Sequence, residues 1–373
     1  RSDMGASNVK WVRLGDYIEQ CDERNSASIN YPVIGINRDK TFMPTVANLD
    51  GVDIAKYKIV TKGMFVFSGM QTGRDICIRI GLYDNEQPAL VSPAYTTFVI
   101  NDDKKVLPEY FFMYFNRAES DRYGWFISDS SVRANLDWPR FLDIEFPLPS
   151  PDEQQKVVNA WKAFREIKEQ NEAKAAPLMQ VCQSYIQELK HKYPLQEIGP
   201  YIEECDERNV DLSVRLSQGI ANTKVFQAPK QVALNSKSDK IVRTGQFGYN
   251  RATTRNGEKI SIAYRTGADC TVSSAYGVFK ITNEDIIEPY FLWMWVSRPE
   301  FDRYARYMSK GSAHEFFEFD EMCRVKIPLP PIEIQRAIVN IYKCANEAKQ
   351  IAEEADRLSR EVCPALLQHV IHS

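Results

Sequence analysis

Two polar stretches rich in arginine, threonine, asparagine and glutamine carry the clearest chemistry in this sequence. SGMQTGRD spans residues 68–75, and NRATTRNGEK spans residues 250–259. Amide and hydroxyl groups of this kind bond to the edges of bases, while guanidinium groups bond to phosphates. Each stretch lies between short β-rich runs, so we expect a loop held on a rigid scaffold. These residue types predict loops that bind nucleic acid.

A second polar turn follows each stretch, with the sequence SSVRANL from residue 130 and GSAHEFF from residue 311. We expect it to face the same groove as the first loop. Arginine and lysine side chains should line the nucleic-acid surface, and Gln71, Thr72, Thr254 and Asn256 are the better candidates for base edges. The candidate contact residues are Lys62, Gln71, Thr72, Arg74, Arg79, Arg133, Asn135, Arg243, Asn250, Arg251, Thr254, Arg255, Asn256, Lys259, Ser312 and His314.

The two stretches occupy matching places in an internal repeat. YIEQCDERN at residues 17–25 returns as YIEECDERN at residues 201–209, and FPLPSPDEQQKVV from residue 146 matches IPLPPIEIQRAIV from residue 327. Repeats of this length predict two copies of one structural unit. The ends of the copies are almost unaltered, whereas the polar loops between them differ. That pattern is typical of two modules that read different sequences.

Positive charge is concentrated in the same places, although the whole chain has a formal net charge of −3. Five Lys or Arg residues face one Asp in the range 56–80, and seven face two acidic residues in the range 235–265. Ordinary solvated loops also contain lysines, so either window alone would be weak evidence. Their occurrence in both copies favours nucleic acid as the partner.

No enzyme or metal site is expected in this chain. The sequence contains no phosphate-binding loop, no HExxH or GxSxG motif, and no glycine-rich or NPP(F/Y) motif of adenine methyltransferases. The acidic CDERN segment could supply metal ligands, but its position after an apolar pair favours a capped turn at the entry of a domain. The eight cysteines of the chain form no CxxC pair, and its four histidines show no ligand spacing. Both observations argue against a zinc site and against disulfides.

Each copy divides into a β-rich part and a long helix. Short runs such as MFVFS and KISIAY predict strands, and PEYFFMYFNRAESDRY predicts helix. The fold class is therefore α+β. We set the boundaries at 9–149 and 193–330 for two β-rich domains and at 150–192 and 331–373 for two long helices. Residues 1–8 are interpreted as an expression scar.

The long helices show heptad spacing. Ser150 is the expected N-cap, followed by Pro151 and by Glu153 three residues after the cap. Pro177 and Pro364 should kink or locally break the helices. The expected seams are Val157, Trp161, Phe164, Lys168, Asn171, Ala175, Leu178, Cys182, Tyr185 and Leu189, and then Ile338, Tyr342, Ala345, Lys349, Ala352, Asp356, Ser359, Cys363, Leu366 and Val370. We expect the two seams to pack together antiparallel; the alternative is that each helix only covers its own domain.

Composition is consistent with a folded protein of two domains. The chain has 373 residues, 44% hydrophobic residues and 12% aromatic residues, which suffices for two cores. Its apolar runs fall short of a membrane span, and no signal peptide opens it. We therefore expect a cytoplasmic location, and the family resemblance described next implies a bacterial or archaeal cell.

The duplicated order of these motifs resembles the specificity subunit of type I restriction–modification enzymes. The resemblance rests on the two PLP junctions into long helices, on KGMFVFSGMQTG, on PEYFFMYF and on SDSSVRANLDWPRFLDIEFPLP. The resemblance covers essentially the whole chain after residue 8. The set of motifs occurs twice, in the order recognition domain, helix, recognition domain, helix. One departure is that the family's small Gly-Thr-x-Gly element is replaced in the second copy by NRATTRNG.

The resemblance implies a non-catalytic subunit with a pseudo-twofold repeat. Each target recognition domain would read one half of a bipartite double-stranded DNA site, and the coiled-coil-like helices would set the spacing. Two modification subunits carrying S-adenosylmethionine would dock on it, and ATP-dependent restriction subunits would join them; this chain itself would hold no cofactor. Two other classes stay open at this point, namely a stand-alone methyltransferase or nuclease with unfamiliar motifs and a protein–protein scaffold without DNA binding.

Overall fold

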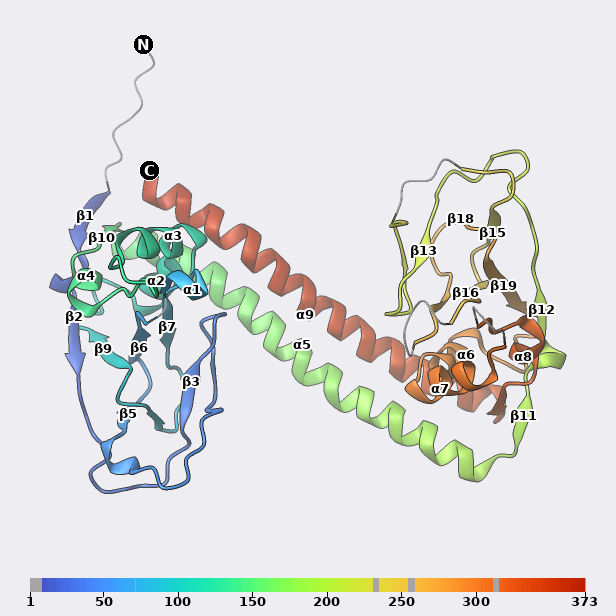
Figure 1. The fold of residues 1–373 in the computed structure, drawn as a ribbon, viewed down its shortest axis with the longest axis horizontal. Coiled ribbons are helices and arrows are strands. Elements are labelled where there is room, and N and C mark those ends of the chain that lie inside the picture. The colour runs from blue at the N-terminus through green and yellow to red at the C-terminus, as the bar shows by residue number, and fades with distance from the viewer. Residues whose placement is uncertain (1–8, 71, 231–234, 254–258, 311–314, 373) are drawn as a thin grey trace, which may run out of the picture. The chain divides into compact units, whose positions relative to one another are not determined.

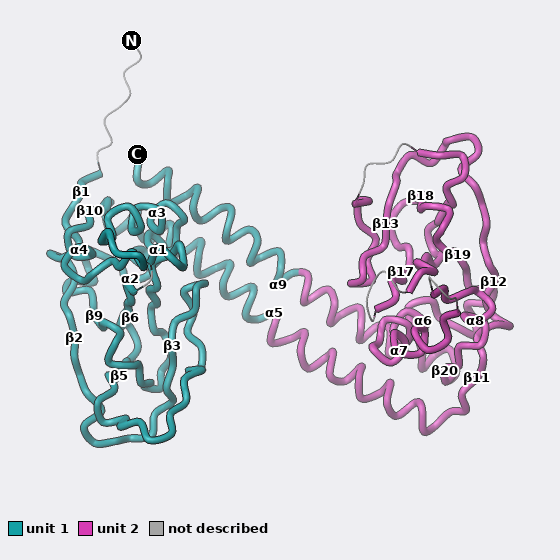
Figure 2. The backbone as a smooth tube through the Cα atoms, viewed as in Figure 1, with its two compact units in different colours: residues 1–170, 351–373 teal, residues 171–350 magenta. Residues whose placement is uncertain are grey.

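The computed structural model describes residues 9–70, 72–230, 235–253, 259–310 and 315–372. The chain forms two compact units, shown in different colours in Figure 2. Unit 1 contains residues 1–170 and 351–373, and unit 2 contains residues 171–350. Each unit therefore combines one β-rich domain with parts of both long helices. Within the described residues, no helix is long and apolar enough to cross a membrane.

Unit 1 is built on a four-stranded antiparallel sheet in the order β2-β9-β6-β7, with three two-stranded sheets around it. Helices α2, α3 and α4 gather beside the start of α5, while β3 and β5 extend away from it (Figure 1). Its strands are β1 Lys10–Arg13, β2 Ile18–Cys21, β3 Ile34–Ile36, β4 Phe42–Pro44, β5 Lys58–Val60, β6 Phe65–Ser68, β7 Arg79–Leu82, β8 Ala89–Val91, β9 Thr96–Ile100 and β10 Glu145–Leu148. Its short helices are η1 Leu14–Asp16, η2 Ile54–Lys56, α1 Thr72–Asp75, α2 Pro108–Phe115, α3 Ala118–Ile127 and α4 Trp138–Leu142.

Unit 2 repeats this topology strand for strand. Its main sheet has the order β12-β19-β16-β17, and the pairs β11-β20, β13-β14 and β15-β18 correspond to β1-β10, β3-β4 and β5-β8. Its strands are β11 Leu195–Glu197, β12 Ile202–Glu204, β13 Gly219–Ile220, β14 Phe226–Gln227, β15 Lys240–Val242, β16 Phe247–Asn250, β17 Ile262–Tyr264, β18 Cys270–Val272, β19 Tyr276–Ile281 and β20 Lys326–Pro328. Its short helices are η3 Gly199–Tyr201, α6 Pro289–Val296, α7 Pro299–Met308 and α8 Phe319–Cys323.

The same aromatic pair lies at the centre of both sheets. Phe65 stacks on Phe98 across β6 and β9 with ring centroids 5.0 Å apart and an interplanar angle of 6°. Phe247 stacks on Phe279 across β16 and β19 with the same distance and angle. Cross-strand aromatic contacts of this kind fix the register of a sheet. The two copies therefore share their core packing as well as their strand order, which confirms the predicted repeat.

Helix α5 spans Pro151–Lys192 and helix α9 spans Ile332–His372. The predicted cap of α5 is confirmed, because the amide of Glu153 donates to Oγ of Ser150 over 3.3 Å. Neither helix is broken at Pro177 or Pro364, so that part of the expectation was wrong. Both prolines are exposed, and water can therefore bond to the carbonyl groups that lose their helical donor.

The long helices complete the core of each unit. In unit 1, Val157 of α5 and Leu367 of α9 are buried in the core of the first domain. In unit 2, Ile186 of α5 and Ile338 of α9 are buried in the core of the second. Each core thus takes the start of one helix and the end of the other, as antiparallel pairing requires. Because the end of α9 lies in the core of unit 1, the alternative in which each helix covers only its own domain is wrong.

Most residues of the two predicted helix seams are buried or half-buried, and at three positions a neighbouring residue is buried in place of the predicted one. Lys168 and Asp356, one from each polar seam centre, form an ion pair of 2.9 Å that helps to set the register of the helices. The hydrogen bond from the Lys168 ammonium lowers the pKa of the Asp356 carboxyl group. Tyr185, Lys349 and Leu366 are exposed, contrary to expectation. Their buried neighbours Ile186, Ala348 and Leu367 face the core instead, because the helix face that packs on a folded domain differs from a strict heptad stripe.

A buried glutamine explains why both PLP junctions keep a Gln. Gln154 is fully buried and accepts a bond from the Leu107 amide at 2.8 Å, while its Nε2 donates to the carbonyls of Lys105 and Pro149. Gln335 makes the corresponding three bonds to Glu288, Ile286 and Pro330. These side chains satisfy backbone groups that would otherwise be buried without partners. They join the start of each long helix to the start of α2 or α6.

Candidate nucleic-acid interface

The first polar loop, residues 69–78, connects the ends of β6 and β7. These strands pair from Phe65 opposite Leu82 to Ser68 opposite Arg79, so the loop projects from one end of a hairpin in the main sheet. Helix α1 lies inside the loop, beside α3 (Figure 1). The Thr72 hydroxyl donates to the Gly69 carbonyl over 2.8 Å, and its side chain is fully buried. In this structure Thr72 therefore shapes the loop and is not available for a base edge, which corrects its assignment as a base-reading candidate.

The second polar loop, residues 128–136, is bonded directly to the first. The Leu136 amide donates to the Gly69 carbonyl over 2.9 Å, and the Gly73 amide donates to the Ala134 carbonyl over 3.2 Å. Inside this loop, Oδ1 of Asp129 accepts from Ser131 and Asn135, and these bonds lower the pKa of the Asp129 carboxyl group. The chain thus brings two polar loops together at one edge of unit 1.

Unit 2 joins its corresponding loops in the same manner. The Thr253 amide donates to the Glu315 carbonyl over 3.0 Å, and the Phe317 amide donates to the Arg251 carbonyl over 2.8 Å. The Thr253 hydroxyl adds a bond of 2.9 Å to the hydroxyl of Ser309. Asn250 lies at the end of β16, where its side chain accepts from the Ala252 amide. The same pairing of loops is therefore present in both copies.

Several predicted residues lie outside the described part of the chain. They are Gln71, Thr254, Arg255, Asn256, Ser312 and His314. Among the described candidates, Arg74, Arg133 and Lys259 are exposed on or beside the paired loops. Asn135 is half-buried and its amide bonds to Asp129.

Two other cations of the loops are paired with acidic neighbours. Arg79 lies 2.7 Å from Oδ2 of Asp75, and Arg251 lies 3.2 Å from Oε2 of Glu318. Arg251 also donates to the Ala275 carbonyl over 2.9 Å. The side chains of Arg251 and Glu318 are 33% and 50% exposed, and surface ion pairs of this kind contribute only about 0–1 kcal/mol, so a phosphate could replace Glu318 at small cost. The side chain of Asp75 is only 11% exposed, so moving Arg79 to a phosphate would leave a buried carboxylate without this partner.

Lys62 and Arg243 do not join the other candidates. Each lies in the turn that precedes β6 or β16, at the opposite end of the hairpin from the polar loop. Lys62 pairs with Glu86, and Arg243 pairs with Glu207 and with Asp269. The sequence placed them with the loops because they are near in residue number. The four residues of the intervening strand separate them in space.

Some of the lysines that were counted in the positively charged ranges 56–80 and 235–265 are buried. Lys58 and its counterpart Lys240 are both 5% exposed. The ammonium of Lys58 donates to the Tyr95 carbonyl over 2.6 Å and lies 3.6 Å from Asp22 of the CDERN segment. Burial lowers the pKa of both lysines. Charge counts along the sequence therefore overstate the positive field at the loops.

The two CDERN segments form the capped turns that the sequence predicted. In the first, Asn25 is buried and exchanges two bonds with the backbone of Ile29, while Arg24 binds Asp22 and the Lys56 carbonyl. Asn209 and Arg208 repeat these contacts. No cluster of His, Cys, Asp and Glu suited to a metal ion occurs among the residues that the structure describes. The repeated motif thus stabilises the turn that leads from β2 or β12 into the domain.

A buried ion pair supports the first loop in each unit, and sequence reasoning missed it. In unit 1 the Lys40 ammonium lies 2.7 Å from Oδ1 of Asp121 in α3, and that oxygen also accepts from the Ile78 amide at the end of the loop. In unit 2 Lys224 lies 2.6 Å from Oδ1 of Asp302 in α7, which accepts from the Ile260 amide. Both lysines have positive φ angles, 61° and 65°. The only sequence signal was that Lys and Asp recur at matching positions.

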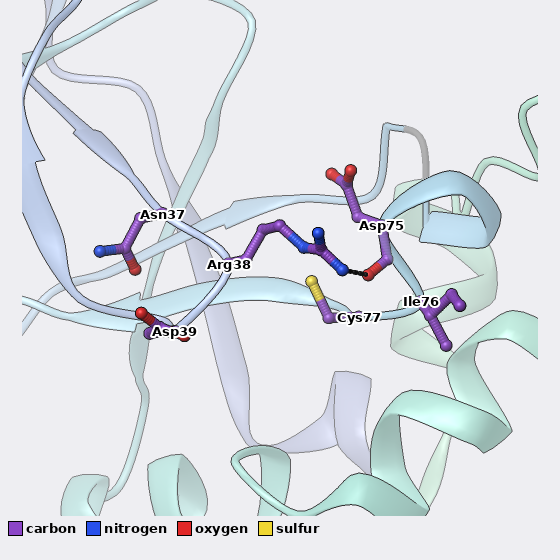
Figure 3. A pocket seen from close by; sticks show the side chains of 6 residues that line it. All are labelled: Asn37, Arg38, Asp39, Asp75, Ile76 and Cys77. Atoms are coloured by element: carbon purple, nitrogen blue, oxygen red, sulfur yellow. Dashed lines mark hydrogen bonds between the residues drawn. The ribbon is translucent and has the colours of Figure 1, made fainter. Parts of the chain in front are cut away.

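The turn that carries Lys40 also contacts the loop at the surface. Figure 3 shows this turn, residues 37–39, across a pocket from residues 75–77. The guanidinium of Arg38 donates to the Asp75 carbonyl over 3.0 Å. The β3–β4 hairpin therefore holds the loop both from within the core and from the surface.

The exposed faces of α3 and α7 are a further feature that sequence reasoning missed. Tyr123, Trp125 and Phe126 are 47%, 51% and 83% exposed at the end of α3, and Tyr307 is 87% exposed at the end of α7. These helices lead directly into the second polar loops. Matching aromatic positions in the repeat were the available signal, because Phe126 and Tyr307 occupy equivalent places.

Comparisons with known proteins concern the whole chain and its fold. No family model matches the chain. A protein of Methanocaldococcus jannaschii described as a type I restriction enzyme MjaX specificity subunit is 19% identical over 392 residues, which cover 92% of this chain and 88% of the relative. The crystal structure of the S subunit of a type I restriction–modification system from M. genitalium superposes with a TM-score of 0.64 at 12% identity, covering 97% of this chain and 96% of that one. In sequence order and in fold, the chain thus has the resemblance that its duplicated motifs predicted, to the specificity subunits of type I restriction–modification enzymes.

Proposed function

We propose that this chain is the non-catalytic DNA-recognition subunit of a type I restriction–modification complex. The observation that carries the proposal is the pair of joined polar loops, present at the same edge of the same fold in both units. Loops on a rigid sheet can present side chains to a DNA groove with little loss of conformational entropy on binding. Two such surfaces in one chain suit a bipartite site.

In this proposal each β-rich domain reads one half of the site. The domains are residues 9–149 and 193–330, and the long helices 150–192 and 331–373 set the distance between the halves. The polar loops differ between the copies while the buried supports are the same, so the two half-sites would differ in sequence. Modification subunits carrying S-adenosylmethionine, two of them in the expected assembly, would supply methyl transfer, and restriction subunits would supply cleavage.

The first prediction concerns catalysis. The purified chain should neither methylate nor cleave DNA, whereas its complex with the modification subunit should methylate a duplex that contains both half-sites. Tritiated methyl transfer to duplexes with both, one or neither half-site measures this. Methylation by the chain alone, after removal of any trace of modification subunit, would favour the rival stand-alone enzyme. Failure of the complex to bind any duplex selected from random DNA would favour a protein–protein scaffold.

The second prediction separates the loop cations from those at the other end of the hairpin. Arg133→Ala should weaken binding of the complex to all duplexes and reduce the slope of log K against log salt by about 0.9, the value for one phosphate contact. Lys62→Ala is the matched control, because Lys62 is also an exposed cation of unit 1 but lies away from the loops. It should leave the slope unchanged. Equal effects of the two substitutions would contradict the proposed position of the interface.

A further inference from the structure

The ends of α3 and α7 carry the same pair of exposed side chains in both units. Arg122 and Phe126 are separated by one helical turn in α3, and Arg303 and Tyr307 have the same separation in α7. Residues four apart lie on one face of a helix. Phe126 and Tyr307 are 83% and 87% exposed. Two aromatic rings left in water at equivalent positions point to a partner that covers them.

Basic charge accompanies each ring. Arg122 has an exposed ion pair of 3.5 Å with Glu119, in which the two side chains are 67% and 58% exposed. Arg303 is likewise exposed. The exposed ion pair between Arg122 and Glu119 competes only weakly with a phosphate for the Arg122 guanidinium group. An exposed ring beside such a cation is the combination that proteins use on nucleic acids, where the ring packs on bases and the cation neutralises the backbone.

Each helix touches the first polar loop of its unit through the residue that precedes the exposed ring. A Cβ added to Gly73 in the first loop would lie 3.1 Å from the indole nitrogen of Trp125, so α3 touches that loop. In unit 2, Nη1 of Arg306 donates to the Thr253 carbonyl over 3.4 Å. The helix ends then continue directly into the second loops. A duplex seated on the paired loops would therefore also meet the helix ends.

We infer that Arg122 with Phe126, and Arg303 with Tyr307, form a third DNA contact in each recognition domain. The ring packs against a base step or a thymine methyl group, and the arginine neutralises a neighbouring phosphate. The hydroxyl group of Tyr307 offers an additional hydrogen bond that Phe126 lacks. This inference rests on the proposed function and extends it from the loops to the helices that border them.

The test uses the full chain in complex with its modification subunit and a duplex carrying both half-sites. Phe126→Ala should weaken binding about 5- to 100-fold, the range expected for loss of one stacked base. The loss should be confined to duplexes that retain the first half-site. Tyr307→Ala should give a loss of the same order for the second half-site only. Tyr307→Phe should restore most of the affinity, which identifies the ring as the contact.

A second measurement tests the arginines, and a third reports on the bases. Arg122→Ala should reduce the salt slope by about 0.9. With 2-aminopurine placed along the first half-site, the wild-type complex should change the fluorescence at one base step, and Phe126→Ala should abolish that change. Tyr185→Ala is the matched control, because Tyr185 is an aromatic residue 46% exposed on α5, outside both polar loops and outside α3 and α7. It should alter neither affinity nor fluorescence.

Three outcomes would overturn the inference. If the wild-type complex binds its bipartite duplex and Phe126→Ala and Tyr307→Ala bind it equally well, the rings do not contact DNA, and the proposed function survives. If these variants instead lose the modification subunit in the absence of DNA, the surface is a protein interface. If the wild-type complex binds no bipartite duplex, the proposed function fails and the inference fails with it.

Discussion

Replacing Asp302 with alanine is expected to lower the free energy of unfolding of unit 2 by about 3–5 kcal/mol. Asp302 and Lys224 have side chains only 9% and 7% exposed, and they pair at 2.6 Å. Burial lowers the pKa of the Lys224 ammonium group, and Asp302 is the neighbour that opposes this shift. Removing the carboxylate leaves the ammonium and the Ile260 amide buried without their common acceptor. The Ile260 backbone should lose its attachment to α7 as well.

The size of this effect should depend on breaking the pair, not on the loss of a charge. The double variant Lys224→Met/Asp302→Leu, in which both partners become apolar, should recover most of the stability. Glu203→Ala removes an exposed carboxylate 3.9 Å from Lys280 and should cost less than about 1 kcal/mol. Urea unfolding of the full chain, followed by protease mapping of the unfolded segment, measures all three variants. A loss below 1 kcal/mol for Asp302→Ala would show that the pair is not buried as described.

Replacing Gly69 with alanine should separate the two polar loops of unit 1. The new Cβ would lie 1.6 Å from the carbonyl oxygen of Leu136, and backbone atoms cannot yield as a flexible side chain does. The Leu136 amide is also bonded to the Gly69 carbonyl, so a shift at either residue breaks that bond. Overpacking of this kind costs about 1–3 kcal/mol, and more where the backbone is involved. Affinity for the first half-site should fall at least about tenfold, a loss of about 1.4 kcal/mol.

The second half-site supplies an internal reference for this substitution. Affinity for duplexes that retain only the second half-site should be unchanged, because Gly69 belongs to unit 1. Gly219→Ala is the matched control, since its new Cβ would meet no atom closer than 3.8 Å. Thermal unfolding and binding by anisotropy would be measured on the same preparations. Wild-type stability in Gly69→Ala would contradict the close contact between the loops, and equal loss at both half-sites would contradict separate reading by the two units.

The sequence by itself determined the plan of the molecule. Segments repeated at a nearly constant offset required two copies of one topology, and each copy indeed has the same strand order and the same stacked Phe pair. The cap at Ser150 and most of the helical seam also followed from local patterns. These features depend on residues close in sequence or on identity between the copies. Both kinds of information are present in one sequence.

Only the tertiary structure decided which polar side chains are available for binding. Lys40, Lys58 and Thr72 are polar residues that the structure places in the interior. Lys62 is near the first loop in residue number, yet a β-strand carries it to the other end of the hairpin. Lys224 and Asp302 meet across 78 residues. Charge and residue type describe what a side chain can do, but burial and long-range pairing depend on how distant segments pack, which no local pattern contains.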